Sequence, residues 1–493
     1  MQDREFELKF EVEPGRASEV ASALAARARP SVNHLAATYF DTPDQALRRA
    51  GYSLRVRQEG GRWRQTVKSL AGGPARGEWE SDIDGPAPAP DLVRTTPAGA
   101  ALDGAALEPL FRVDVERRSV TAEAAKARVE ASLDSGRAVA PDREAEFGEL
   151  ELELKSGAPA SLFALARRLR RELRLRPSFA AKAERGFALL DAPAEPGRHW
   201  RSPDIGPQMS AGAAFQAIAV AALAQMADNA GQFAASDHPE IVHQLRVGAR
   251  RLRSAMKVFT PVIADSRCAP LEGELEWLAS ELDGARNLDV LLAGAVRRAG
   301  RSKNGARLAA LKMRLAQERE RAYARARAAA ASDRFSTLLF DLLAWSRIGP
   351  WTSAAALGAK WRDAGVTAFA VEALEDGRAE VRRRGRGFGD LSARGRHKLR
   401  IRAKRLRYAA EDLRGLFPGE QKTADRFISR LKALLDCLGE LNDIATATTL
   451  LEPHDPPKRL QKRERRREAR LLAKAEKAFD AVADAPRFWP KQI

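Results

Sequence analysis

Two kinds of hydrophobic patterning divide this chain. In the first part, several stretches alternate apolar and charged residues with a period of two, which is typical of β-strands with two different faces. The clearest are Glu5–Glu13, Tyr52–Arg57, Gly61–Lys68 and Gly148–Lys155. Beyond residue 207 the pattern is helical almost throughout. We therefore predict an α+β protein of several domains: an antiparallel sheet whose apolar side is covered by helices such as Ser161–Leu173, followed by an all-helical part.

The boundary between the two patterns is rich in proline and glycine. It runs from Asp191 to Pro207 and has the composition of a linker. We predict a sheet domain at residues 1–190, a linker at 191–207 and a helical domain at 208–493. A chain of 493 residues is long enough for more than one hydrophobic core.

The polar faces of the predicted strands carry acidic and basic residues in dense stripes. An ordinary sheet with one solvated face is the simpler interpretation. If the sheet closes into a barrel, however, the same alternation lets the charged stripes point inward. Carboxylates that lie close together repel each other unless a cation separates them, and Mg²⁺ prefers carboxylate and phosphate oxygens. Acidic and basic stripes in one closed sheet therefore indicate metal-assisted hydrolysis of a phosphate chain.

Residues 1–190 contain an ordered set of motifs: Glu5-Phe-Glu-Leu-Lys9, Tyr39-Phe-Asp-Thr-Pro43, Leu54-Arg-Val-Arg57, Gln65-Thr-Val-Lys68, Glu149-Leu-Glu-Leu-Glu-Leu-Lys155 and Lys182-Ala-Glu-Arg-Gly-Phe187. Together these motifs resemble the CYTH family of triphosphate tunnel metalloenzymes. The resemblance implies a tunnel of eight antiparallel strands, Mg²⁺ or Mn²⁺ held by glutamates, and a triphosphate gripped by Arg and Lys. Ala181 stands where relatives often have Ser, a departure that changes no charged position.

The resemblance also assigns roles to residues. It makes Glu5, Glu7 and Lys9 catalytic; it places metal ligands at Glu5, Glu7, Glu149, Glu151 and Glu153, with Asp134 as a further partner; and it places substrate contacts at Arg55, Arg57, Lys68, Arg118, Lys182 and Arg185. Arg117 and Arg118 face opposite ways on a strand, and the sequence does not choose between them; we assign the substrate contact to Arg118. Glu78 and Glu80 are expected on the acidic side.

The charge of the chain is concentrated in its second part. The net charge is +18, and by count residues 1–190 carry roughly +1 and the remainder about +17. Such an excess indicates a polyanionic partner, which could be nucleic acid, an acidic membrane surface or polyphosphate.

Three further features concern the compartment. The only two cysteines, Cys268 and Cys437, lack metal-ligand spacing, and the charged N-terminus offers no apolar core for a secretory signal. The Ala-rich stretch Met209–Ala227 is interrupted by glutamines, so we interpret it as a buried helix rather than a membrane span. We expect a cytoplasmic protein that does not contact a membrane and that associates with polyphosphate granules.

The helical part contains an internal repeat. His243-Gln-Leu-Arg-Val-Gly-Ala-Arg-Arg-Leu-Arg253 matches His397-Lys-Leu-Arg-Ile-Arg-Ala-Lys-Arg-Leu-Arg407 at an offset of 154 residues. Each copy is followed by a second element, Gly284–Asp289 or Gly439–Asp443, with Asn287 at 44 residues from the first His and Asn442 at 45 residues from the second. Two matched elements at matched spacing predict duplication of a helical unit.

Each repeat places four basic residues on one helical face without an acid between them. They are His243, Arg246, Arg250 and Arg253 in the first copy and His397, Arg400, Lys404 and Arg407 in the second. Like charges at this spacing repel, so we expect an external polyanion, with a solvated basic face as the alternative. The repeats resemble the CHAD family, the conserved-histidine α-helical domain. This implies two four-helix bundles that bind polyphosphate. The basic run Lys458–Arg470 is interpreted as a solvated surface.

The leading hypothesis is an inorganic triphosphatase, a phosphoanhydride hydrolase, whose helical domain binds polyphosphate. The succession of CYTH and CHAD resemblances supports it. Three alternatives stay open: a non-catalytic polyphosphate-binding protein associated with granules, a nucleic-acid-binding protein, and an adenylate cyclase. Nucleic acid is disfavoured because aromatic residues make up only 6% of the chain, which provides poorly for base stacking.

Overall fold

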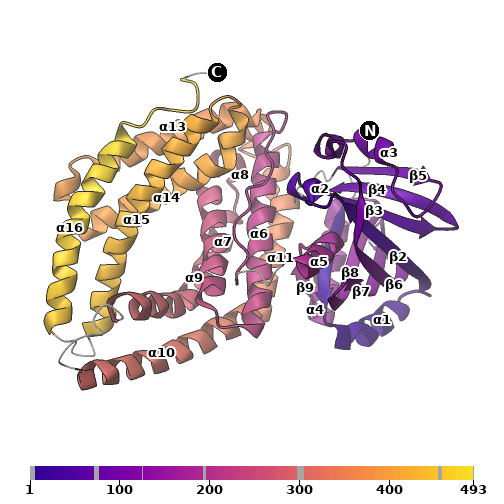
Figure 1. Ribbon diagram of the computed structural model, residues 1–493, viewed down its shortest axis with the longest axis horizontal. Helices are drawn as coiled ribbons and strands as arrows, with labels where there is room; N and C mark the ends of the chain where they lie inside the picture. Colours follow the sequence, from indigo (N-terminus) through magenta and orange to yellow (C-terminus); the bar gives the residue numbers. More distant parts are fainter. Residues whose placement is uncertain are drawn as a thin grey trace. The chain divides into compact units, whose positions relative to one another are not determined.

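The computed structural model describes residues 6–70, 77–124, 126–191, 196–296, 305–452 and 458–491. Contacts divide the chain into two compact units, Met1–Glu195 and Pro196–Ile493. The first is built on a β-sheet and the second on helices (Figure 1). Each unit has its own hydrophobic core, as the two kinds of sequence pattern predict.

The first unit contains an antiparallel sheet with the strand order β5-β4-β3-β2-β6-β7-β8-β1-β9. The strands are β1 (Glu7–Val12), β2 (Ser31–Asp41), β3 (Tyr52–Glu59), β4 (Arg62–Ser69), β5 (Glu78–Ile83), β6 (Glu108–Ala124), β7 (Ala127–Val139), β8 (Glu144–Ser156) and β9 (Arg176–Ser178). The four predicted strands are β1, β3, β4 and β8. The expected closed barrel of eight strands is not confirmed, because the sheet has nine strands and no pairing joins β5 to β9 among the described residues.

Five α-helices of this unit are described, and all but α5 cover the apolar face of the sheet. They are α1 (Ala17–Ala25), α2 (Ala46–Arg49), α3 (Pro90–Arg94), α4 (Pro159–Leu173) and α5 (Lys182–Leu190). α1 and α4 contact β6 and β7, and α4 also contacts β8, whose Leu150 and Leu152 are fully buried. Leu54 and Val56 of β3 lie in a second cluster with residues of α2 and α3. The charged residues of β3 and β8 therefore point to the other face, as the alternation requires.

α5 is the exception, because it lies on the charged side of the sheet. Its Ala183 and Phe187 pack against Phe111, Val113 and Phe147. This packing covers one end of the charged face and brings the first turn of α5, with Lys182 and Arg185, to the middle of the sheet.

The second unit is made of long helices. They are α6 (Ala211–Ala235), α7 (Pro239–Val258), α8 (Thr260–Ile263), α9 (Cys268–Leu291), α10 (Gly305–Ala331), α11 (Asp333–Ile348), α12 (Ala359–Asp363), α13 (Val366–Gly385), α14 (Ala393–Leu413), α15 (Gln421–Leu451) and α16 (Lys458–Ala483). Part of the segment predicted as linker belongs to this unit: Trp200 and Ser202 both hydrogen-bond Asp412 of α14.

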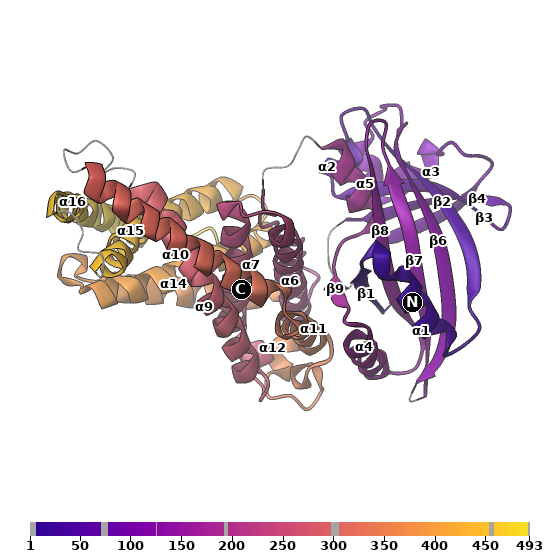
Figure 2. The same cartoon turned by 90° about the horizontal axis from the view of Figure 1, so that it is seen from below.

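The internal repeat is visible in the contacts between helices. α6, α7, α9 and α10 contact one another in a cycle, and α13, α14, α15 and α16 repeat that cycle. Figure 1 labels these helices, and Figure 2 shows α15 beside α16. The two basic motifs lie on the corresponding helices α7 and α14, which also contact each other. The expected pair of four-helix bundles stays a prediction.

α6 contains the stretch that we interpreted as a buried helix. It is long and apolar enough to cross a membrane, but 67% of the relevant window is buried inside the unit. Its buried residues include Phe215, Leu223 and Phe233. This burial is what a core helix shows.

Candidate functional site

The charged face of the sheet gathers three buried carboxylates. Pairing of β7 with β8 sets Asp134 opposite Glu149, and pairing of β8 with β1 sets Glu151 opposite Lys9. Glu149 and Glu151 are two residues apart on one strand and so share a face. One oxygen from each of Asp134, Glu149 and Glu151 lies within 4.8 Å of the others. We call these three residues the carboxylate cluster.

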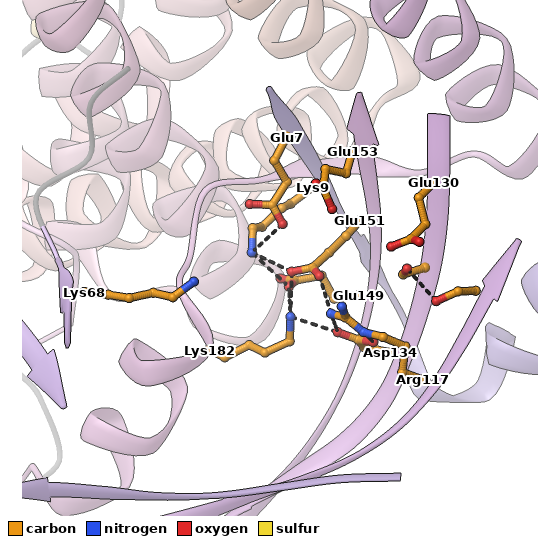
Figure 3. A network of polar contacts seen from close by, with 12 residues as sticks. Glu7, Lys9, Lys68, Arg117, Glu130, Asp134, Glu149, Glu151, Glu153 and Lys182 are labelled. Carbon is orange, nitrogen blue, oxygen red and sulfur yellow. Dashed lines mark hydrogen bonds and ion pairs between the residues drawn. The ribbon is translucent and has the colours of Figure 1, made fainter. Parts of the chain in front are cut away.

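Basic groups from three other elements converge on the carboxylate cluster (Figure 3). Lys182 Nζ of α5 lies 2.8 Å from Asp134, 3.1 Å from Glu149 and 2.6 Å from Glu151. Lys9 Nζ of β1 lies 2.6 Å from Glu151 and 3.7 Å from Glu149. Arg117 of β6 donates two hydrogen bonds of 2.7 Å to Asp134 and a further one to Glu151. The negative charge of the carboxylate cluster is thus compensated by cationic side chains of the same chain.

The pKa values follow from this arrangement. Burial alone would raise the pKa of Glu151, but Lys182, Lys9 and Arg117 outweigh burial and hold it well below its usual value. Burial alone would lower the pKa of Lys182, but Glu151, Glu149 and Asp134 raise it. Both groups therefore stay charged at neutral pH, and the site holds opposite charges in a space with little water.

Of the other predicted metal ligands, those that the structure describes lie outside the carboxylate cluster or at its margin. Glu7 lies 3.2 Å from Lys9, and burial together with the nearby Glu151 raises the pKa of Glu7. Glu153 lies farther along β8, where it pairs at 2.6 Å with Lys155. Glu5 lies outside the described residues. Of the five predicted metal ligands, the structure brings Glu149 and Glu151 together, and it adds Asp134.

The predicted phosphate-binding residues of β3 and β4 lie on the same charged face. Lys68 pairs at 2.7 Å with Glu78, and Arg55 lies 3.9 Å from that carboxylate. Arg57 follows two residues after Arg55 and so shares its face. Lys68 extends towards the carboxylate cluster (Figure 3), and it is close enough for Lys9 to influence its pKa. Burial, and then Arg55, lower the pKa of Lys68. β4 and β1 are far apart in the strand order, so the sheet must curve strongly.

Arg185 and Glu80 are two further charged residues near this face of the sheet. Arg185 of α5 lies 3.4 Å from Glu149, and its guanidinium stacks 4.9 Å from the ring of Phe147. Glu80, expected on the acidic side, instead accepts a hydrogen bond from Thr66 of β4. The acidic groups of β5 thus balance the cations of β3 and β4 and do not join the carboxylate cluster.

The choice of Arg118 is corrected by the structure. Its side chain is 47% exposed and pairs with Glu116 on the opposite face of β6. Arg117 takes the place that we assigned to Arg118, because the register of β6 and β7 sets Arg117 directly opposite Asp134. Alternation alone cannot decide which of two adjacent arginines faces a site, whereas a known register can.

A second gathering of charge lies in the helical unit. His243, Arg246 and Arg250 of α7 face Arg400, Lys404 and Arg407 of α14, and each of the six lies within electrostatic reach of others in the set. Arg286 of α9 joins them and is the neighbouring charge with the largest effect on His243. We call these seven residues the basic cluster. The sequence did not predict Arg286 as a member of this cluster, although Arg286 lies in Gly284–Asp289, the element that follows the first basic motif.

Few acids compensate the basic cluster. Arg246 pairs with Asp283, and Arg407 lies 3.4 Å from Glu411. Arg250 donates a 2.9 Å hydrogen bond to the hydroxyl of Tyr408. Lys404 makes no hydrogen bond or ion pair within the part of the chain that the structure describes, and the buried Nε of Arg400 has no hydrogen-bond partner there. Basic groups that face each other with few acidic partners indicate a site for an external anion.

Two predicted members lie away from the basic cluster. Arg253 points to α9, where it pairs with Glu276. His397 is exposed, and its Nδ1 lies 3.2 Å from the amide oxygen of Asn442. The duplicated motifs therefore do not place their histidines equivalently, because His243 is in the basic cluster and His397 is not.

The basic cluster should make the ligand-free helical unit less stable at lower pH. Burial, then Arg250, Arg400, Arg246 and Arg407, lower the pKa of Lys404 to about 5, although Asp443 of α15 also faces it. Folding therefore releases a proton from Lys404, and between about pH 5 and 10.5 stability rises with pH. We expect the melting temperature of the helical unit to rise by a few degrees from about pH 7 to 9, measured by circular dichroism without phosphate.

Lys404→Met provides the control for this expectation. The variant should melt at a higher temperature than wild type at neutral pH and should lose most of the dependence on pH, because the group that titrates is gone. Equal pH slopes for wild type and Lys404→Met would contradict the assignment.

Comparisons with known proteins agree with the two-unit description. The CYTH domain model matches residues 3–187 and the CHAD domain model matches residues 217–452. An inorganic triphosphatase from Haemophilus influenzae is 30% identical over 201 residues, which span 38% of this chain and 55% of that protein. The match thus covers about half the length of this relative.

Two solved structures are also similar in part. The crystal structure of the CHAD domain from the plant Ricinus communis is 26% identical, covers 60% of this chain and 98% of its own, and has a TM-score of 0.49. PptA from Streptomyces chartreusis is 19% identical, covers 56% of this chain and 99% of its own, and has a TM-score of 0.41. The two family models match in sequence order. The chain therefore contains a CYTH domain at residues 3–187 followed by a CHAD domain at residues 217–452.

Proposed function

We propose that the sheet unit hydrolyses inorganic triphosphate with the help of a divalent metal. The observation that carries this proposal is the carboxylate cluster, in which Asp134, Glu149 and Glu151 lie beside Lys9, Lys182 and Arg185 on one face of the sheet. A phosphate chain needs many cationic partners, and its hydrolysis needs stabilisation of the negative charge that develops. The name of the Haemophilus influenzae relative agrees with this activity.

The donor set suits a hard cation. Three carboxylate oxygens within 4.8 Å of one another are the ligands that Mg²⁺ and Mn²⁺ prefer, and no Cys or His is among them. Asp134, Glu149 and Glu151 would hold the ion, with Glu7 at the margin. When bound, such an ion supplies charge neutralisation on phosphate and activation of water. Glu5, as a further ligand, stays a prediction.

The remaining residues of the charged face would position the substrate. Lys9, Lys182 and Arg185 lie on one side of it, and Arg55 and Lys68 lie on β3 and β4. The curvature that brings Lys68 within reach of Lys9 supports a closed tunnel in which cations surround a phosphate chain. In this position they would orient the chain and stabilise its oxygens as the phosphoanhydride bond breaks.

Product analysis tests this proposal and the alternative cyclase. We expect Mg²⁺ and triphosphate to give phosphate and diphosphate in equal amounts, because one phosphoanhydride bond is cleaved by water. With ATP we expect no cyclic nucleotide, since the aromatic rings described on this face, Phe111, Phe147 and Phe187, are buried and leave no ring there for a base to stack on. Ion chromatography and mass spectrometry identify the products. Formation of cyclic AMP without phosphate release from triphosphate would overturn the assignment.

We further propose that the helical unit binds inorganic polyphosphate through the basic cluster. The support is the set of facing basic groups on α7 and α14, among which Lys404 makes no hydrogen bond or ion pair within the described residues. A chain of phosphates carries charge at every unit and needs no base-specific contact. The helical unit would then recruit longer chains and the sheet unit would cleave triphosphate.

A further inference from the structure

Lys182 occupies the centre of the carboxylate cluster. Its ammonium lies within 3.1 Å of an oxygen from each of Asp134, Glu149 and Glu151, so it contacts all three candidate metal ligands at once. Lys9 is the second ammonium there, but it reaches only Glu151 and Glu149. Figure 3 shows both lysines directed into the cluster. In the ligand-free chain, an internal cation therefore fills the role of a bound ion.

A metal held by these oxygens would compete directly with Lys182. Oε1 of Glu149 and Oε1 of Glu151 are the atoms that Lys182 contacts. Two cations that share the same buried oxygens repel strongly, because little water screens them. Arg117 can stay, since it contacts Glu151 through Oε2 and not through the Oε1 atom that Lys182 contacts, and it does not contact Glu149. Lys182 has a flexible four-carbon stem and starts α5, so its ammonium can move without changing the strands.

We propose that Lys182 is an internal counter-ion that must leave the carboxylate cluster when a divalent metal binds, and that triphosphate favours this exchange by providing phosphate oxygens for the displaced ammonium. This inference rests on the proposed function and deepens it. Its consequence is coupling: metal and triphosphate each bind weakly alone and strengthen each other's binding, by the same factor in both directions. The chain would thereby avoid holding a metal when no substrate is present.

Binding of Mn²⁺ alone, measured from the electron paramagnetic resonance signal of the free ion, tests the exchange without any activity. We expect Lys182→Met to bind Mn²⁺ about tenfold more tightly than wild type, because the competing cation is gone. Lys9→Met should show a smaller gain of the same sign, since Lys9 does not reach Asp134. It is also a second variant if Lys182→Met folds poorly.

Lys68→Met is the matched control. Lys68 is a partly buried lysine of the same charged face, but it pairs with Glu78 and not with the carboxylate cluster. Its removal should change Mn²⁺ affinity by less than about twofold. The melting temperature gives a second readout: Mn²⁺ should stabilise Lys182→Met more than wild type, since the ion replaces the missing counter-ion.

The possible failures can be told apart. If wild type binds Mn²⁺ and Lys182→Met binds it equally or more weakly, the exchange is wrong and the proposed hydrolase stands. If Lys68→Met gains as much as Lys182→Met, the effect is general electrostatics and the exchange is wrong. If neither wild type nor any variant binds Mn²⁺ at about 10 mM, far weaker than metal sites of this kind, the metal-dependent function fails as well.

Discussion

Glu151→Gln should reduce phosphate release from triphosphate by about a thousandfold, the scale expected when an electrostatic group of a hydrolytic site is lost. Among the described residues, Glu151 is the one carboxylate in contact with Lys9, Lys182 and Arg117 together. The substitution keeps the shape and removes the charge, so the metal would lose a ligand and the three cations would lose their common partner. Initial rates of phosphate release at saturating Mg²⁺ measure the effect.

Glu116→Gln is the matched control for Glu151→Gln. Glu116 lies on the opposite face of β6, where it pairs with Arg118. Its substitution removes the same charge from the same sheet and should leave the rate within about twofold of wild type. Equal losses in the two variants would show that net charge, and not the carboxylate cluster, governs the reaction. A fully active Glu151→Gln would place the chemistry elsewhere.

The second large effect is expected in the helical unit. The double variant Arg250→Gln/Lys404→Gln should bind inorganic polyphosphate about a hundredfold more weakly, and the dependence of affinity on salt should become shallower. Arg250 and Lys404 come from the two repeated helices, and after burial Arg250 is the neighbouring charge that lowers the pKa of Lys404 most. Affinity is measured by isothermal titration calorimetry at several salt concentrations, with polyphosphate of one defined length.

Arg253→Gln/Lys257→Gln is the control for the double variant. These residues both lie on α7 and are again one arginine and one lysine, but they pair with Glu276 and Glu272 of α9. We expect their loss to reduce affinity by less than about threefold. Equal losses would mean that polyphosphate binds by overall charge. Stronger binding of DNA than of polyphosphate at physiological salt would favour the nucleic-acid alternative.

The sequence predicted the charged face because alternation specifies which side of a strand each residue occupies. Lys9, Glu149, Glu151 and Lys68 all lie where that pattern puts them. It could not supply the register between strands that are distant in sequence. The pairing of Arg117 with Asp134 depends on that register, so we selected Arg118 and treated Asp134 only as a further partner.

In the helical unit, too, the sequence could not predict how distant elements meet. The repeat identified the two basic helices, and helical spacing placed His243, Arg246 and Arg250 on one face. Which parts of that face meet the other copy depends on how the helices cross. Arg253 turns to Glu276 of α9, while Arg286 enters the basic cluster from α9. Neither outcome can be read from spacing within a single helix.

The most direct test of the hydrolase is phosphate release from inorganic triphosphate by the intact chain, measured over a range of Mg²⁺ concentrations and with excess chelator. We predict release that rises with Mg²⁺, saturates, and stops with chelator. Release that is unchanged by chelator would contradict the role of the carboxylate cluster. An absence of release, with polyphosphate still bound, would make the chain a polyphosphate-binding protein without this activity.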